Sequence, residues 1–428
     1  MNFPHDNPGN HLKRLTTIQS NKGVTFLTPA AFPGSHCPMH AAAHLANSIQ
    51  GLSSLVLGMQ ECAYYSRQVL PGPVGKDGSL HWMYVLDASE VVFGCRNGLQ
   101  QALIEMNQAG AKVILLIITC IPELIGEDIA ALVCELQPQL TARLLPIPAA
   151  HFCCNGYPAG LWRTLEALAG LMQPRTLIPH SANLLGLHPT AAAAPLIQAL
   201  SAAGLTLQRL GPDSSIDEFL TAPASALNIV LSPYMLPLAK RMEQHFGTPF
   251  VALHDAYGAL EIAAAYAGIA EKLGLDWTDT FTQGANNLRA VEKIASSRLK
   301  GLRFFATDAS IDPIPLAAYL ATLGMEPLLL HIEEFYPEDR QWTQRLHALG
   351  YDPWACHRVN PVAEEAVFAA LRPDFVLGTV PPSREMTLPH ADQLYKMNGP
   401  FGYERTIWLL DKILQVLDTP VPLPAGKD

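Results

Sequence analysis

The stretch Val113-Ile114-Leu115-Leu116-Ile117-Ile118-Thr119-Cys120 decides the fold of this chain. Its six consecutive apolar residues are far fewer than the ~20 that a membrane-spanning helix needs, so they predict a buried strand. A helical stretch at Leu99–Asn107 precedes this strand, a helix beginning near Pro122 follows it, and a further strand is expected at Arg143–Ile147. We expect an extended approach through Val91-Val92-Phe93-Gly94. Strands that alternate with helices of this length predict an α/β unit with a parallel sheet.

The same alternation continues in two further units. Strands of the second are expected at Arg175–Pro179, Leu205–Leu210, Asn228–Ser232 and Phe250–Leu253, and strands of the third at Arg303–Thr307, Pro327–His331 and Asp374–Leu377. The sequence therefore predicts domain I over residues 1–172, domain II over 173–292 and domain III over 293–395. Residues 396–428 include an amphipathic helix, Arg405–Leu417, that we expect to pack back onto domain I.

The charge balance and the N-terminus restrict the partners and the compartment. The 428 residues carry 28 Lys and Arg against 38 Asp and Glu, a formal net charge of −10. This argues against nucleic acid as a partner, because proteins that bind a phosphate backbone carry basic patches. Residues 1–21 mix Asn, His, Pro and Lys and contain no apolar segment of the signal-peptide type. We therefore expect a cytoplasmic protein with no nucleic-acid and no membrane partner.

Three of the eight cysteines stand at the ends of predicted elements. Cys37 precedes Pro38 at the start of a helix, Cys62 follows Met59-Gln60-Glu61, and Cys120 lies at the carboxyl end of the buried strand. Open α/β sheets bind ligands outside the carboxyl ends of their strands, and thiolates are the ligands of iron–sulfur clusters. Three thiolates leave a four-iron cluster one ligand short. This predicts a cluster completed by a partner chain.

The alternative is that these cysteines only fill the core, because Cys is a small apolar residue and among the most buried types. None of the three positions matches the C-x-x-C spacing of a compact zinc site. Two other cysteines, Cys134 inside a predicted helix and Cys356 in the third unit, are interpreted as packing residues.

Several segments together resemble the component 1 proteins of nitrogenase and of nitrogenase-like reductases. The most specific segment is Thr119-Cys120-Ile121-Pro122-Glu123-Leu124-Ile125-Gly126-Glu127-Asp128-Ile129. The others are Cys37-Pro38 with Ala41–Ala43, Cys62 before Tyr64-Tyr65, Val92-Phe93-Gly94, Gly324-Met325-Glu326-Pro327 and Gly399-Pro400-Phe401-Gly402-Tyr403-Glu404. The resemblance covers nearly the whole chain, and it favours an iron–sulfur role for the three cysteines.

The resemblance implies the nitrogenase component 1 fold, an α/β fold of three Rossmann-like domains with parallel sheets. It implies an oxidoreductase that is handled anaerobically, in which Cys37, Cys62 and Cys120 hold a cluster shared with an α-like subunit in an α2β2 heterotetramer. The cluster would be an eight-iron, P-cluster-like group or a [4Fe–4S] cluster. Electrons would come from a separate ATP-dependent iron protein. The run Gly72–Asp77 is too short for a P-loop and lacks the Ser or Thr, so ATP hydrolysis belongs to that partner.

The spacing of the cysteines resembles the β-type, nitrogenase K-like chain. Cys62 lies 25 residues after Cys37, and Cys120 lies 58 residues after Cys62. The α-type chain supplies a further Cys to the active-site cofactor, and the matching segment here, Val230–Tyr234, has none. We therefore expect no catalytic residue in this chain, and we interpret His390 as a loop or interface residue.

Two departures from the family pattern leave the ligand set open. His151 aligns with the β-type serine that can ligate the P-cluster, and Cys95 replaces the family's second glycine after Phe93-Gly94. His151, with the adjacent Cys153 and Cys154, could supply additional cluster ligands, since imidazole and thiolate both bind iron. The other interpretation is a substituted interface loop.

The function expected from the resemblance is that of a β-like electron-relay subunit. All three cysteines persist, which favours a nitrogenase-like reductase, with methylthio-alkane reductase as the preferred candidate. A cofactor-assembly scaffold subunit of the nitrogenase N-like type and a tetrapyrrole reductase subunit are the alternatives. A metal-free α/β binding protein is a further hypothesis of a different class. The sequence specifies neither the substrate nor the number of irons in the cluster.

Overall fold

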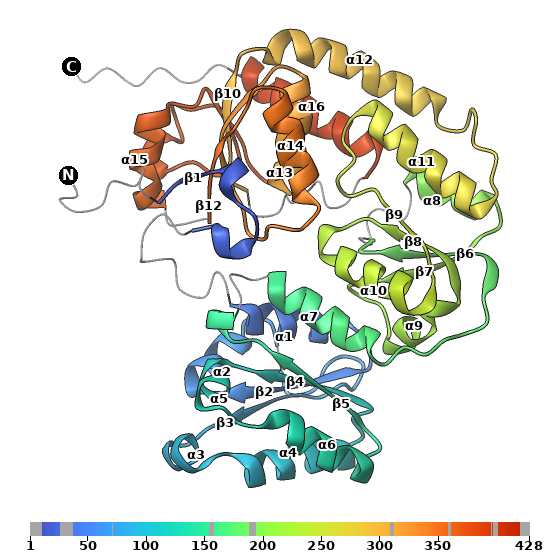
Figure 1. The fold of residues 1–428 in the computed structure, drawn as a ribbon, viewed down its shortest axis with the longest axis vertical. Coiled ribbons are helices and arrows are strands. Elements are labelled where there is room, and N and C mark those ends of the chain that lie inside the picture. The colour runs from blue at the N-terminus through green and yellow to red at the C-terminus, as the bar shows by residue number, and fades with distance from the viewer. Residues whose placement is uncertain are drawn as a thin grey trace. The chain divides into compact units, whose positions relative to one another are not determined.

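The computed structural model describes residues 11–25, 37–70, 72–153, 158–187, 194–308, 312–357, 361–394, 396 and 401–419. The chain divides into two compact units. We call residues 37–187 and 204–251 the cysteine unit, and residues 11–25, 194–203 and 252–419 the C-terminal unit. Each unit is described by itself (Figure 1).

The first sheet of the cysteine unit confirms the α/β prediction. Its order is β3 (His81–Val85), β2 (Leu52–Gly58), β4 (Val113–Ile118) and β5 (Arg143–Pro148), and every neighbouring pair is parallel. The accompanying helices are α1 (Pro38–Ser48), α2 (Gln60–Ser66), α3 (Ala88–Phe93), α4 (Arg96–Gln108), α5 (Cys120–Ile125), α6 (Ile129–Leu136) and α7 (Pro158–Ala169). The predicted strand at 113–118 is confirmed to the residue.

The central strand β4 is buried on both faces, as its continuous apolar sequence requires. Leu115 and Ile117 join a hydrophobic cluster with residues of α1 and α7, whereas Ile114 and Leu116 join a second cluster with residues of α4 and α6. Figure 1 shows this layering, with α1 and α7 on one side of the sheet and α4 and α6 on the other. The alternation follows from the period-2 geometry of a strand.

One local prediction in this region is wrong, and a second is confirmed only for the start of its helix. The segment expected to be extended at Val91–Gly94 lies largely in helix α3, because Asp87 and Glu90 form a capping box that starts a helix at Ala88. The helix expected near Pro122 is two short helices, α5 and α6. They are separated where Gly126 adopts a φ of +75°, a conformation that favours glycine.

The second sheet of the cysteine unit has the order β7 (Thr206–Leu210), β6 (Ile178–Leu185), β8 (Ser225–Val230) and β9 (Phe250–Ala252). The pairs β6–β7 and β6–β8 are parallel. Two helices belong to this part, α9 (Ile216–Thr221) and α10 (Leu236–Phe246). One hydrophobic cluster joins the two sheets of this unit, since Leu185 and Val230 share it with Leu115.

The C-terminal unit is built on a six-stranded sheet. The order is β1 (Lys13–Arg14), β12 (Trp354–Cys356), β11 (Glu326–His331), β10 (Arg303–Ala306), β13 (Phe375–Leu377) and β14 (His390–Ala391). Its helices are α8 (Pro195–Ala202), α11 (Ala259–Leu273), α12 (Thr282–Leu299), α13 (Pro313–Thr322), α14 (Asp339–Ala348), α15 (Pro361–Leu371) and α16 (Tyr403–Asp418). All strand pairs are parallel except β1 with β12.

The N-terminal segment corrects one assignment. Residues 11–25 fall within the predicted domain I, but Lys13 and Arg14 pair with β12 in the third sheet. There Leu12 joins the hydrophobic core, and Arg14 stacks on Trp354. Helix α16 packs against α12 and β14 of its own unit. Its expected return to domain I and the three domain boundaries stay predictions.

The structure also shows how far Cys134 and Cys356 are buried and whether any helix could span a membrane. Cys356 is buried in β12, as a packing residue should be, but Cys134 is exposed on α6. The interpretation of Cys134 as a packing residue is therefore wrong, because it lies on the solvent side of that helix. Among the described residues, no helix combines the length and the apolar character that crossing a membrane requires.

A buried arginine holds the start of α16, and its replacement should destabilise the C-terminal unit. Arg405 is 6% exposed, donates to the carbonyls of His254, Ala256 and Leu253 at 2.7, 2.8 and 3.3 Å, and lies 4.3 Å from the Tyr257 ring. Arg405→Met removes these three hydrogen bonds and the contact of the guanidinium with the Tyr257 ring, and it should cost about 3 kcal/mol of unfolding free energy, measured by denaturant titration.

The matched control is Arg298→Met. Arg298 of α12 also pairs with α16, at Asp418, but this ion pair is exposed. Loss of an exposed pair costs less than about 1 kcal/mol. Equal destabilisation by the two substitutions would contradict the anchoring role of Arg405.

Candidate functional site

Parallel strand order brings two of the predicted cysteines to one edge of the first sheet. Strands β2 and β4 are neighbours, with Leu57 paired to Ile118. Cys62 lies in α2 directly after β2, and Cys120 is the first residue of α5 directly after β4. Cys37 is the N-cap of α1, followed by proline at the first helical position. The three predicted positions therefore sit at starts of helices, two of them at the carboxyl ends of adjacent strands.

Gly58, the last residue of β2, is the point where these segments meet most closely. A Cβ atom at this position would lie 2.3 Å from Thr119 Oγ1 and 3.0 Å from the Cys62 sulfur. The first distance is shorter than real Cβ contacts allow, and the second is tighter than most of them. The absence of a side chain at Gly58 is therefore what lets the Cys62 thiol and the Thr119 hydroxyl face the same small volume.

The charges of the other two cysteines affect the pKa of the Cys37 thiol. Burial raises the pKa of the Cys37 thiol, and negative charge on Cys62 and Cys120 raises it further. Hydrogen bonds from the backbone N–H groups of His40 and Met39 act in the opposite direction. Three thiolates this close repel one another, so a positively charged group that binds them would stabilise their ionised form.

His151 lies beside Cys120, as the alignment of its segment suggested. It begins a short 3-10 helix, His151–Cys153, that follows β5. Its backbone N–H donates to the Cys120 sulfur at 3.3 Å, and its Nδ1 is 3.8 Å from the same sulfur. The structure therefore gathers His151 with Cys120, whereas Cys154 lies outside the described residues, as do the surroundings of the Cys153 side chain.

The donor set fits an iron–sulfur cluster better than a single ion. A tetrahedral zinc ion holds its thiolates at ~2.3 Å, which forces the ligands tightly together. Within the described part of the chain, no three His, Cys, Asp or Glu side chains converge closely enough to hold one ion. A cluster of several irons and sulfides separates its cysteines more widely, and thiolates are its usual ligands.

Two other residues that the sequence analysis discussed, Cys95 and His390, lie in different surroundings. Cys95 is buried at the start of α4, where its backbone N–H donates to Glu127 at 2.6 Å; burial and the Glu127 carboxylate raise the pKa of its thiol to about 12. Such a thiol is a poor metal ligand, because the ligand is the thiolate. His390 is in β14 of the C-terminal unit, with Nδ1 2.9 Å from the Leu388 carbonyl.

Neither the close contact at Gly58 nor the orientation of the Thr119 hydroxyl was predicted from the sequence. Thr119 belongs to the segment that carries the resemblance, but only as part of a motif. A glycine that ends a buried strand just before a cysteine-bearing helix is a signal for close approach. The signal can be used only when residues 52–58 are recognised as a strand, and this strand was not among those predicted.

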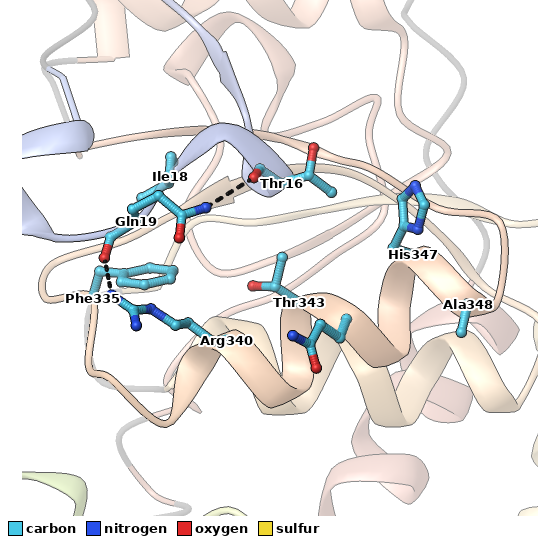
Figure 2. A pocket seen from close by; sticks show the side chains of 9 residues that line it. Thr16, Ile18, Gln19, Phe335, Arg340, Thr343, His347 and Ala348 are labelled. Carbon is cyan, nitrogen blue, oxygen red and sulfur yellow. Dashed lines mark hydrogen bonds between the residues drawn. The ribbon is translucent and has the colours of Figure 1, made fainter.

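A groove in the C-terminal unit is a separate candidate (Figure 2). Its volume is about 410 Å³, and Arg340, Thr343 and His347 of α14 line it opposite the segment Thr16–Gln19. Arg340 donates to the Gln19 carbonyl at 2.9 Å. The described lining contains no cysteine, so the groove lacks the thiol ligands of an iron–sulfur site.

Comparison with known proteins defines the class. Residues 37–418 match the family model described as nitrogenase component 1 type oxidoreductase. Because this match spans most of the 428 residues, the chain belongs to that family.

Two solved structures and two relatives make the similarity more specific. The structure of nitrogenase Cp1 at pH 6.5 matches with a TM-score of 0.72 and 16% identity, and the match covers 91% of this chain and 93% of that one. The structure of nitrogenase Cp1 at pH 5 matches with a TM-score of 0.66 and 17% identity, and the match covers 96% of both chains. These likenesses confirm the predicted fold. The chain is 24% identical over 285 residues to the nitrogenase iron-molybdenum cofactor biosynthesis protein NifE of Nostoc sp., and 29% identical over 249 residues to that of Clostridium pasteurianum.

The sequence matches to these relatives are partial. They cover 62% and 56% of this chain and 58% and 54% of the respective relatives, so the chain spans a little over half the length of each.

The close contact at Gly58 generates a prediction. Gly58→Ala should force Thr119 and Cys62 apart and weaken iron retention about tenfold, a magnitude typical of changes beside metal ligands. Iron per chain after anaerobic purification and gel filtration measures this. The control is Gly72→Ala, whose added Cβ meets only an ordinary 3.9 Å contact. Full iron retention in Gly58→Ala would mean that the contact does not position the ligands.

Proposed function

We propose that this chain is the β-like subunit of a nitrogenase-like reductase and that it holds half of an interfacial iron–sulfur cluster. The observation that carries the proposal is the position of Cys62 and Cys120 directly after the adjacent strands β2 and β4, with Cys37 at the start of α1. Such a cluster supplies one-electron transfer at low potential. It would pass electrons from an ATP-dependent iron protein to a cofactor in an α-like subunit, with methylthio-alkane reductase as the preferred member.

The same sheet edge is rich in exposed apolar side chains, which supports a partner subunit there. Each of the four strands is followed by an element with such a residue: Tyr64 in α2, Phe93 in α3, Leu124 in α5 and Phe152 after β5. Their exposures are 68, 87, 69 and 59%. Exposed apolar residues concentrated in one region are typical of protein–protein interfaces.

The proposed assembly explains two properties of this edge together. A four-iron cluster needs one ligand more than three cysteines supply, and an eight-iron cluster needs more still. A partner that covers the apolar residues would bring these ligands and exclude water from the cluster. His151, beside Cys120, is the one further ligand candidate that the described part of this chain places next to a predicted cysteine. We propose the α-like subunit of an α2β2 heterotetramer as that partner.

Substitution of the cysteines tests the proposal. Cys62→Ala and Cys120→Ala should lose most of the iron and acid-labile sulfide of the complex, together with MgATP-dependent electron uptake from the iron protein. The control is Cys134→Ala, since Cys134 belongs to the same unit but is exposed on α6. The measurement is iron, sulfide and low-temperature EPR on complexes purified anaerobically. Unchanged iron and electron uptake in Cys62→Ala would refute the assignment.

A second candidate function is that of a cofactor-assembly scaffold subunit. The supporting observation is that the relatives found by sequence are biosynthesis proteins named NifE. In a scaffold, the same three thiols would hold a cluster or a precursor that is later handed to another protein.

Electron flow separates the two candidates. A relay subunit should sustain many rounds of MgATP-dependent oxidation of the reduced iron protein by the purified complex. A scaffold should stop after a number of electrons equal to its cluster content, and it should instead transfer iron to an acceptor that lacks cofactor. The measurement is the number of electrons accepted per complex, in stopped-flow and steady-state assays. Stoichiometric uptake without turnover would refute the relay function and favour the scaffold.

A further inference from the structure

Thr119 carries a buried hydroxyl group without a hydrogen-bond partner in the described structure. The residue is 2% exposed, and its Oγ1 forms no hydrogen bond in the described structure. A buried hydroxyl without a partner costs roughly 1–3 kcal/mol. Such a group in a native fold calls for a partner that the protein atoms do not provide.

The local role expected of Thr119 is also missing. Thr119 is the N-cap residue of α5, a position where a threonine side chain normally accepts a hydrogen bond from the first turn of the helix. No such cap bond forms here. In the helices α3 and α9, by contrast, the side chains of Asp87 and Ser215 make their cap bonds. The Thr119 hydroxyl is therefore not used to cap its own helix.

The hydroxyl lies near the Cys62 thiol. The position of a Cβ on Gly58 would lie 2.3 Å from Thr119 Oγ1 and 3.0 Å from Cys62 Sγ, so both atoms border one small volume. The other two thiols each have N–H donors: Met39 and His40 for Cys37, and His151 for Cys120. None of the hydrogen bonds described in the structure ends on the sulfur of Cys62.

We propose that the Thr119 hydroxyl donates a hydrogen bond to a cluster sulfur at Cys62, either the cysteine thiolate or a sulfide beside it, and so raises the reduction potential of the cluster. This inference rests on the proposed function, because it requires a cluster on Cys37, Cys62 and Cys120. Thr119 is a positioning and tuning residue, and it ligates no iron.

The direction of the effect follows from charge. Reduction adds one electron, which makes the sulfur atoms more negative and therefore better hydrogen-bond acceptors. A donor fixed beside them stabilises the reduced form more than the oxidised form, and hydrogen bonds to cluster sulfurs are known determinants of potential. The buried surroundings strengthen this effect, because a low local dielectric weakens charge interactions less than water does.

The test uses the complete complex with two substitutions at one position. Thr119→Val keeps the shape of the side chain but removes the hydroxyl, whereas Thr119→Ser keeps the hydroxyl. Iron content and the midpoint potential from an EPR-monitored redox titration are measured for both and for the wild type. We expect all three to retain iron, with Thr119→Val shifted to a more negative potential and Thr119→Ser close to wild type. A changed EPR line shape in Thr119→Val alone would support a contact with the cluster.

The outcomes distinguish the inference from the proposed function. Retained iron and an unchanged potential in Thr119→Val would overturn the role of Thr119 and leave the cluster intact. A wild-type complex without iron would overturn both. If Thr119→Val fails to load iron, the pair Thr119→Ser and Thr119→Ala replaces it, since these differ by the hydroxyl alone. Equal potentials in that pair would overturn the inference, and a more negative potential in Thr119→Ala would support it.

Discussion

The parallel alignment of β2 with β4 is the constraint on which the candidate site depends. Because Leu57 pairs with Ile118, the two strands end side by side, and the chain leaves them through Gly58 and Thr119 into helices that carry Cys62 and Cys120. A one-residue shift of either strand would move the two cysteines apart and turn every side chain of that strand to the opposite face. The hydrophobic clusters on both sides of β4 therefore stabilise the geometry of the site as well as the fold.

The candidate site combines features that favour a bound cluster and a partner subunit. Its thiols are crowded enough for Cys62 and Cys120 to raise the pKa of Cys37, a buried threonine hydroxyl lacks a partner, and the surrounding sheet edge exposes large apolar side chains. A bound cluster would relieve the first two features, and a partner subunit would relieve the third. Natural proteins tolerate such local costs mainly at functional sites.

Local sequence signals predicted a large part of this architecture. The apolar run of β4 and the strand expected at Arg143–Ile147 correspond to the core of the first sheet. The prediction failed where local hydrogen bonds decide the structure against the hydrophobic pattern. The capping box that starts α3 is an example. The prediction also failed where partners are distant in the chain, because nothing local in Lys13-Arg14 indicates pairing with Trp354 and Ala355.

The candidate site divides in the same way. The three cysteines could be identified from residue type, position and family resemblance, and the structure places two of them, Cys62 and Cys120, directly after the adjacent strands β2 and β4. Cys95 could not be assigned from sequence, because only the fold places it against Glu127. The close approach at Gly58 and the uncapped hydroxyl of Thr119 are consequences of tertiary geometry.

The most direct test of the central claim is low-temperature EPR, with iron and acid-labile sulfide analysis, on the wild-type complex purified anaerobically with its partner. The account predicts stoichiometric iron and sulfide and a cluster signal that appears or disappears on reduction. A complex that is folded and assembled but contains no iron and no sulfide would contradict it.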